Sequence, residues 1–126
     1  MYIHLSSKDS LEAHPNNHGA DFTVDLGKVL NFPGNYKVAL TEIDYDGKKG
    51  DVYIFADVAS TSFVRDSYLP ILRVTDIPKT FAHRQYVPLA QESILQIQIY
   101  IRDRRYREPS VPPKFSRCTL HITKKG

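Results

Sequence analysis

The sequence has a single cysteine, Cys118, among its 126 residues, so no disulfide can form within the chain. This excludes a small secreted domain held by internal disulfides and favours a reducing compartment. No apolar run approaches the roughly 20 residues that a membrane-spanning helix needs. The first residues also lack the basic and apolar regions of a signal peptide. We therefore expect a protein that folds in the cytosol or nucleus and has no membrane partner.

Glycine is also scarce, and the six glycines never reach the spacing of a phosphate-binding or dinucleotide-binding loop. No serine has the sequence context of a nucleophile, and Cys118 lies in an apolar segment, where burial raises the pKa of a thiol and makes it inert. The acidic residues are scattered, and no pattern pairs two carboxylates for glycoside chemistry. The sequence therefore predicts no catalytic residues and no cofactor, and we expect a protein that is not an enzyme.

The histidines suggest a metal site only weakly. His14 and His18 have a spacing that binds zinc on a helix, but the proline, asparagines and glycine around them disfavour a helix. No second ligand cluster completes the site, so we predict a solvated loop and no metal. His4 and His121 alternate with apolar neighbours and are expected on exposed or interfacial strand faces. An enzyme on a cupin-like barrel is the weakest hypothesis, because its metal-binding pattern is missing.

Alternation of apolar and polar residues is the main positive signal, and it marks strands with one buried face. The clearest case is Ile94–Ile101, where Gln96 and Gln98 alternate with aliphatic residues. We expect four aliphatic side chains of this segment to face the core: Leu95, Ile97, Ile99 and Ile101. The length of the chain and its hydrophobic fraction of 41% fit one domain, residues 1–126.

Similar patterns predict further short strands along the chain. Their segments are Tyr2–Leu5, Phe22–Leu26, Tyr36–Tyr45, Asp51–Ser60, Ile71–Val74, Tyr86–Leu89 and Cys118–Thr123. Pro88 cannot donate a ladder hydrogen bond, so its segment suits a sheet edge. The polar segment Asp46–Gly50 predicts a hairpin between the strands on either side of it. Seven or eight antiparallel strands without a convincing helix predict an all-β sandwich or barrel.

The most prominent charged segment is Arg102–Arg107, which holds four arginines and a tyrosine. Guanidinium groups bind phosphate and tyrosine rings stack on bases, so this segment suits contact with nucleic acid. The alternative is a solvated or partner-binding hairpin loop, in which Asp103 and Glu108 offset part of the charge. The net charge of +3 permits an acidic partner without requiring one. A non-enzymatic β-sandwich module that binds nucleic acid or protein through Arg102–Arg107 is therefore one hypothesis.

Blocks of residues spread over almost the whole chain support another hypothesis. The most specific are YIFADV at Tyr53–Val58 and DSYLPILRV at Asp66–Val74, in which Asp, Pro and Arg hold their separations. The others are ADFTVDL at 20–26, YKVALTEI at 36–43, YVPL at 86–89, IQIYIRD at 97–103 and TLHI at 119–122. In this order the blocks resemble the single jelly-roll penton, or minor capsid, proteins of Polinton (Maverick) elements, adintoviruses and related small double-stranded DNA viruses such as adomaviruses. Departures from the family pattern include Arg65 in place of the usual glycine and the short Asp46–Gly50 segment where many members carry a long insertion.

The resemblance implies a single jelly-roll β-sandwich without enzymatic activity. It implies a homo-oligomer, a pentamer at icosahedral vertices, beside a double-jelly-roll major capsid protein. The location would be the virion, after assembly in the host nucleus or cytoplasm, and packaged DNA is a candidate contact. A capsid accessory protein is the alternative role within the same setting.

Assembly interfaces favour aromatic residues and arginine, which selects a set of candidate assembly or partner contacts. They are Tyr53, Arg65, Tyr68, Arg73, Tyr100, Arg102, Arg104, Arg105, Tyr106 and Arg107. Arg73 follows two aliphatic residues and precedes Val74. If its side chain is buried, we expect it to pair with a carboxylate such as Asp57 or Asp66.

Overall fold

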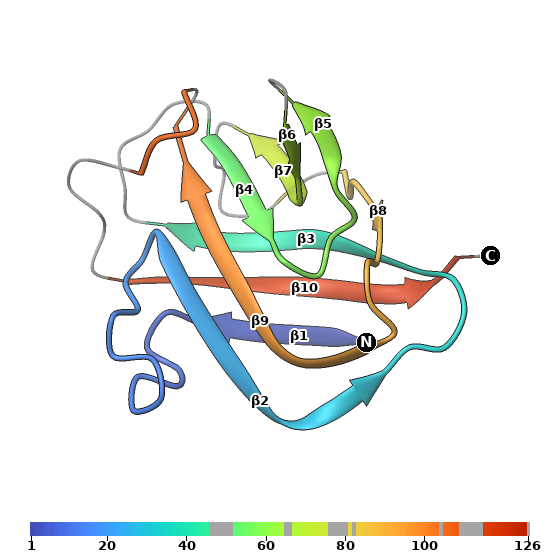
Figure 1. Cartoon of the computed structure of the whole chain (residues 1–126), viewed down its shortest axis with the longest axis horizontal. Helices are drawn as coiled ribbons and strands as arrows, with labels where there is room; N and C mark the ends of the chain where they lie inside the picture. The colour runs from blue at the N-terminus through green and yellow to red at the C-terminus, as the bar shows by residue number, and fades with distance from the viewer. Residues whose placement is uncertain are drawn as a thin grey trace.

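The computed structural model describes residues 1–45, 52–64, 67–75, 81, 83–103, 105–108 and 115–125, and these residues form β-strands and no helix (Figure 1). The strands are β1 (Tyr2–Ser6), β2 (Asp21–Asn31), β3 (Tyr36–Tyr45), β4 (Val52–Ala56), β5 (Ser62–Val64), β6 (Ser67–Leu69), β7 (Ile71–Thr75), β8 (Val87–Pro88), β9 (Ser93–Arg102) and β10 (Ser116–Lys124). Within these ranges there is no helix that is long and apolar enough to cross a membrane.

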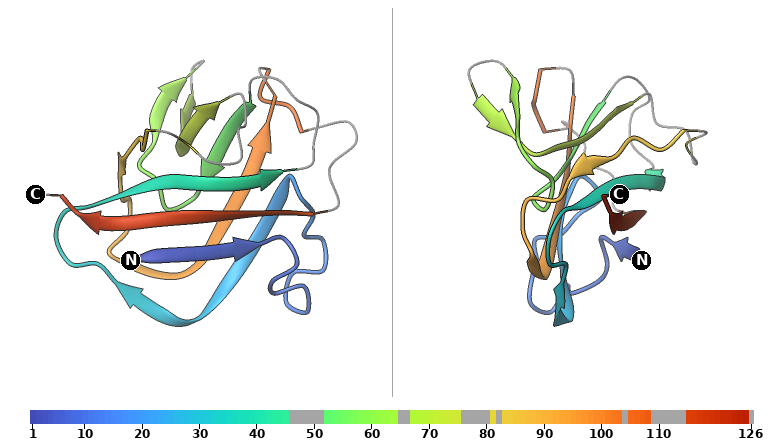
Figure 2. Two further views of the ribbon diagram at one scale, coloured as in Figure 1. Left: turned by 180° about the vertical axis from the view of Figure 1, so that it is seen from behind. Right: turned by 90° about the vertical axis from the view of Figure 1, so that its right-hand side faces the viewer.

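Two four-stranded antiparallel sheets make up the body of the molecule. One has the order β1-β10-β3-β8 and the other the order β2-β9-β4-β7. Figure 2 shows β1, β10 and β3 in one layer and β2, β9 and β4 in the other. The short strands β5 and β6 pair only with each other. The prediction of an all-β, antiparallel protein is therefore confirmed, and the described residues form ten strands where at most eight were expected.

The hairpin predicted between Tyr36–Tyr45 and the strand after it is wrong. Strand β3 pairs with β10 and β8, whereas β4 pairs with β7 and β9 in the other sheet. The chain therefore crosses from one layer to the other after β3. Both strands carry apolar side chains that can be buried across the sandwich as well as side by side, so local alternation did not distinguish the two arrangements. The predicted edge position of Pro88 is confirmed, because β8 is the last strand of its sheet.

The core lies between the sheets and contains side chains from both of them. Its fully buried members include Val38, Leu40, Leu120 and Ile122 from one sheet and Ile54, Ile97, Ile99 and Ile101 from the other. Each contributes about 1.5–3 kcal/mol relative to an exposed side chain.

The prediction that Leu95 faces this core is wrong, because its side chain is 56% exposed while that of Ile94 is 1% exposed. The cause is a register shift between β2 and β9. Asp25 pairs with Gln96 and Leu30 with Ile94, so four residues of β2 stand opposite one residue of β9. Gly27 lies in this bulge with φ of +79°, a conformation that glycine adopts without strain.

Truncation of these two neighbouring side chains tests the register shift. Ile94→Ala should lower the free energy of unfolding by about 2–5 kcal/mol, because it leaves a cavity in the core. Leu95→Ala should change it by less than about 1 kcal/mol, because water already reaches the side chain. Urea unfolding measures the free energy of unfolding of both variants. A larger loss in Leu95→Ala than in Ile94→Ala would contradict this register.

Candidate functional site

Four aromatic rings gather on the outer face of β4 and β9, and we call them the outer aromatic cluster: Tyr53, Phe55, Tyr100 and Tyr106. Phe55 and Tyr100 are paired across the two strands, and their rings stack with centroids 4.6 Å apart and an interplanar angle of 10°. The ring of Tyr106 lies 4.5 Å from that of Tyr53. Residues directly opposite each other in antiparallel strands bring their side chains together, which explains why rings from distant segments meet at this surface.

The turn after β9 places Tyr106 on this surface. The carboxylate of Asp103 accepts hydrogen bonds from the backbone N–H groups of Arg105 and Arg107, at 2.8 and 3.0 Å. The bond from Arg107 is the main cause that holds the pKa of Asp103 below its ordinary value. Tyr106 has φ of +60°, which costs roughly 1–2 kcal/mol for a residue with a side chain. Its ring contacts with Tyr53 and Phe55 offset this cost.

Two of the predicted arginines on this surface are already paired with carboxylates. Arg102 lies 3.5 Å from Asp21 and stacks over the ring of Tyr100 at 4.9 Å. Arg107 lies 3.2 Å from Asp103. Arg105 is exposed, while Arg104 and Arg65 lie outside the described residues. The expected hairpin loop at Arg102–Arg107 is wrong in one respect, because β9 and β10 belong to different sheets and the segment leaves one layer for the other.

The remaining candidates lie elsewhere. Tyr68 is 71% exposed on β6. Arg73 is half-buried on β7, where its guanidinium stacks 3.8 Å from the ring centroid of Phe81 and donates to the carbonyl of His83 at 2.9 Å. The structure thus gives Arg73 an aromatic ring and a carbonyl, whereas the carboxylate of Asp57 accepts the backbone N–H of Gln98 at 3.0 Å. Asp66 lies outside the described residues.

A second surface was missed in the sequence, and we call it the Arg84 cluster: Tyr2, Lys37, Arg84, Tyr86 and His121. It lies at one end of the outer face of the sheet β1-β10-β3-β8. Arg84 donates to the hydroxyl of Tyr2 at 2.7 Å and to that of Tyr86 at 3.3 Å. The hydroxyl of Tyr86 lies 2.7 Å from Nδ1 of His121. Tyr2, Lys37 and His121 are far apart in the sequence, and the strand register brings them to one face of the sheet.

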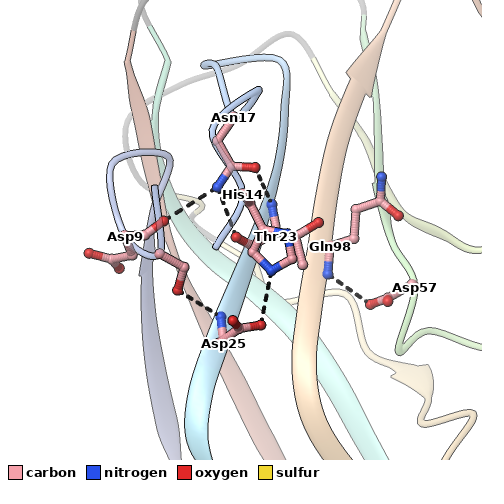
Figure 3. Close-up of polar contacts among 8 residues, drawn as sticks. Asp9, His14, Asn17, Thr23, Asp25, Asp57 and Gln98 are labelled. Carbon is pink, nitrogen blue, oxygen red and sulfur yellow. Dashed lines mark hydrogen bonds and ion pairs between the residues drawn. The ribbon is translucent and has the colours of Figure 1, made fainter. Parts of the chain in front are cut away.

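The loop between β1 and β2 is fixed to the edge of β2 by side chains (Figure 3). The side-chain amide of Asn17 accepts from the backbone N–H of Thr23 at 2.9 Å and donates to the carbonyl of the same residue at 2.9 Å. It therefore occupies the place of a neighbouring strand on the open edge of β2. His14 contacts Asp25 at 3.0 Å and also helps to hold the loop.

No metal site emerges at these histidines. His14 binds Asp25, and His18 binds Glu108 at 2.9 Å and accepts the backbone N–H of Ala20. Across the described ranges no group of three or more histidine, cysteine or acidic side chains is arranged to hold a metal ion. His4 and His121 lie on outward-facing positions of their strands, as predicted.

A shallow depression of about 520 Å³ lies at the other end of the face that carries the Arg84 cluster. Its charged lining residues are Asp9, Glu42, Asp44 and Arg117. Arg117 lies 3.5 Å from Asp44, and Glu42 accepts the hydroxyl of Thr119 at 2.9 Å. The depression is therefore acidic overall, since three carboxylates are offset by one guanidinium.

Comparison with known proteins identifies no relative. No protein-family model, curated protein or solved structure matches the chain.

Burial makes a clear prediction for Cys118. Its side chain lies in the core, and burial raises the pKa of the thiol to about 12. Since the thiolate is the reactive form, the folded protein should not react with a thiol reagent such as iodoacetamide at pH 8, and the urea-unfolded chain should react fully. Intact mass spectrometry measures both states. Rapid alkylation of the folded protein would contradict the buried position.

Arg73 allows a test of the contact with Phe81. Burial lowers the pKa of the Arg73 guanidinium, and its Nε is buried without a hydrogen-bond partner in the described part of the chain. Arg73→Met should therefore change the free energy of unfolding by less than about 1 kcal/mol, because an apolar side chain suits this position. Phe81→Ala should lower it by about 1–2 kcal/mol, because the ring is half-buried. A loss of about 3 kcal/mol or more in Arg73→Met would instead indicate a buried ion pair.

Proposed function

We propose that the two sheets form a single jelly roll. The support is a nested set of pairs: β1 with β10, β2 with β9, β3 with β8 and β4 with β7. Such nesting describes one long antiparallel ribbon, in which β5 and β6 are an insertion at the turn. Folding this ribbon brings β10 beside β3 and β9 beside β4. In each of the two resulting sheets, strands from the first half of the chain alternate with strands from the second half, which is the connectivity of a jelly roll.

The sequence blocks that resemble penton proteins coincide with parts of this ribbon that join strands. Asp57 follows β4 and binds the backbone N–H of Gln98 on β9. The carbonyl of Pro70, just before β7, accepts the N–H of Ala56 at 3.1 Å. Arg73 on β7 stacks on Phe81. Asp57, Pro70 and Arg73 therefore have framework roles, which is how residues that characterise a shared fold are expected to act.

From this pairing and these blocks we infer that the protein is a structural capsid subunit of the penton kind, without enzymatic activity. It forms pentamers at the vertices of a virion beside a double-jelly-roll major capsid protein. A ring of this kind uses heterologous contacts, in which one surface of a subunit meets a different surface of its neighbour. The outer aromatic cluster with Arg102, Arg105 and Arg107 has the composition of such a contact.

The same residues give little support to the alternative function, a module that binds nucleic acid. Arg102 and Arg107 are paired with Asp21 and Asp103, which lowers the net charge available to phosphates. The rings of the outer aromatic cluster stack on one another, so their faces are partly occupied before any base arrives.

The mass of the purified protein in solution tests the capsid proposal. A pentamer of a 14.4 kDa chain has a mass of about 72 kDa. We expect this species in multi-angle light scattering, either alone or with the major capsid protein of the same virus. Tyr106→Ala should reduce the pentameric fraction, because it removes a central interface ring, whereas the control Leu95→Ala should not. A monomer under every condition, including with the partner, would reject the proposal.

A further inference from the structure

The Arg84 cluster spans all four strands of its sheet. Arg84 precedes β8 at one edge, and its guanidinium reaches the hydroxyl of Tyr2 on β1 at the other edge. The ring of His121 on β10 lies 4.5 Å from that of Tyr2 and 5.9 Å from that of Tyr86. Lys37 on β3 holds its ammonium 4.6 Å above the ring of Tyr86. The surface is therefore a preformed arrangement of two cations on aromatic rings.

The positive charges of this cluster have no carboxylate partner in the described part of the chain. Among the described residues Arg84 contacts the hydroxyls of Tyr2 and Tyr86 and, at 3.5 Å, His121, and the ammonium of Lys37 lies over the ring of Tyr86. Arg102, Arg107 and Arg117 differ, because each of them faces a carboxylate. The pKa of His121 is lowered by burial and then by nearby positive charges, which include Arg84 and Lys37. The local electrostatic potential is therefore positive.

The hydrogen bonds leave donors free to point outward. Arg84 donates to the oxygen of Tyr86, and the same hydroxyl lies 2.7 Å from Nδ1 of His121. Arg84 also donates to the oxygen of Tyr2, and this leaves the Tyr2 proton for another acceptor. The guanidinium has five N–H groups and remains exposed. An incoming carboxylate can accept hydrogen bonds from the guanidinium of Arg84 and from the hydroxyl of Tyr2.

We propose that the Arg84 cluster binds a carboxylate of a short acidic segment of a partner protein, with Arg84 and Tyr2 as hydrogen-bond donors and Lys37 as a second cation. Arginine and tyrosine are the residue types that dominate binding energy at protein interfaces. This site lies on the opposite sheet from the outer aromatic cluster, and its occupation does not depend on whether the protein forms a pentamer.

The acidic depression on the same face favours a short occupant over nucleic acid. Its lining includes Thr119, which is two positions from His121 on β10, so the depression begins about 7 Å from His121 at a strand rise of about 3.3 Å per residue. A phosphate backbone that runs along the face would pass Asp9, Glu42 and Asp44 and be repelled by them. A few carboxylates over the Arg84 cluster avoid this repulsion.

NMR titration of the full chain with the blocked peptide acetyl-Glu-Asp-Glu-amide tests the proposal. We expect saturable shifts at Tyr2, Arg84 and His121, and an upward shift of the pKa of His121, because the bound anion offsets the positive potential. Arg84→Gln should weaken binding about tenfold or more, since it removes charge-assisted hydrogen bonds. The matched control Arg117→Gln, on the same face, should retain the affinity of the unmodified protein. Urea unfolding of both variants verifies that they remain folded.

Three outcomes would overturn the proposal. One is the absence of any shift at millimolar peptide, and another is equal affinity in Arg84→Gln. The third is tighter binding of a 12-nucleotide single strand than of the peptide, with the same dependence on Arg84, which would assign the cluster to nucleic acid. Light scattering measures the mass of the oligomer in a separate experiment, so a failure of peptide binding can be distinguished from a failure of the pentamer proposal.

Discussion

The fold depends on the antiparallel pairing of the first half of the chain with the second half. Strand β1 lies beside β10, and this pair closes a loop of about a hundred residues. Strand β2 lies beside β9, and this pair closes a loop of several tens of residues. Such closure costs conformational entropy that only the apolar interior repays. The inner faces of both sheets supply that interior, and buried isoleucines of β9 are its centre. Cys118 is one of the side chains buried there, and burial raises the pKa of its thiol.

Because the inner faces are occupied by packing, the two clusters described above lie on the outer faces of the sheets. Each sheet presents a different surface there. The outer aromatic cluster is held by ring stacking and by arginines already paired with carboxylates, and the Arg84 cluster is held by tyrosine hydroxyls and keeps its positive charge. Two unlike surfaces on opposite sides of the sandwich fit the proposed assembly, in which each subunit has different neighbours on its two sides.

Much of the fold could be predicted because strand alternation is a local property. Tyr36–Tyr45 matches β3, and the predicted segments near β1, β7, β9 and β10 differ from the strands by a few residues. The candidate site was predicted only in part. Tyr53, Tyr100, Arg102 and Tyr106 come together, whereas Tyr68 and Arg73 lie apart from them. Residue type indicated which side chains favour interfaces, but exposure and neighbours depend on pairing across the sheet.

The sequence by itself determined where most strands lie and which of their faces is apolar, because side chains alternate with a period of two wherever a strand is half-buried. Tertiary structure decided which strands are neighbours, why Ile94 rather than Leu95 is buried, and how Tyr2, Arg84 and His121 meet. The physical reason is that each of these outcomes depends on a partner far along the chain. The local alternation of apolar and polar residues does not indicate a register shift or a contact between residues more than 80 positions apart.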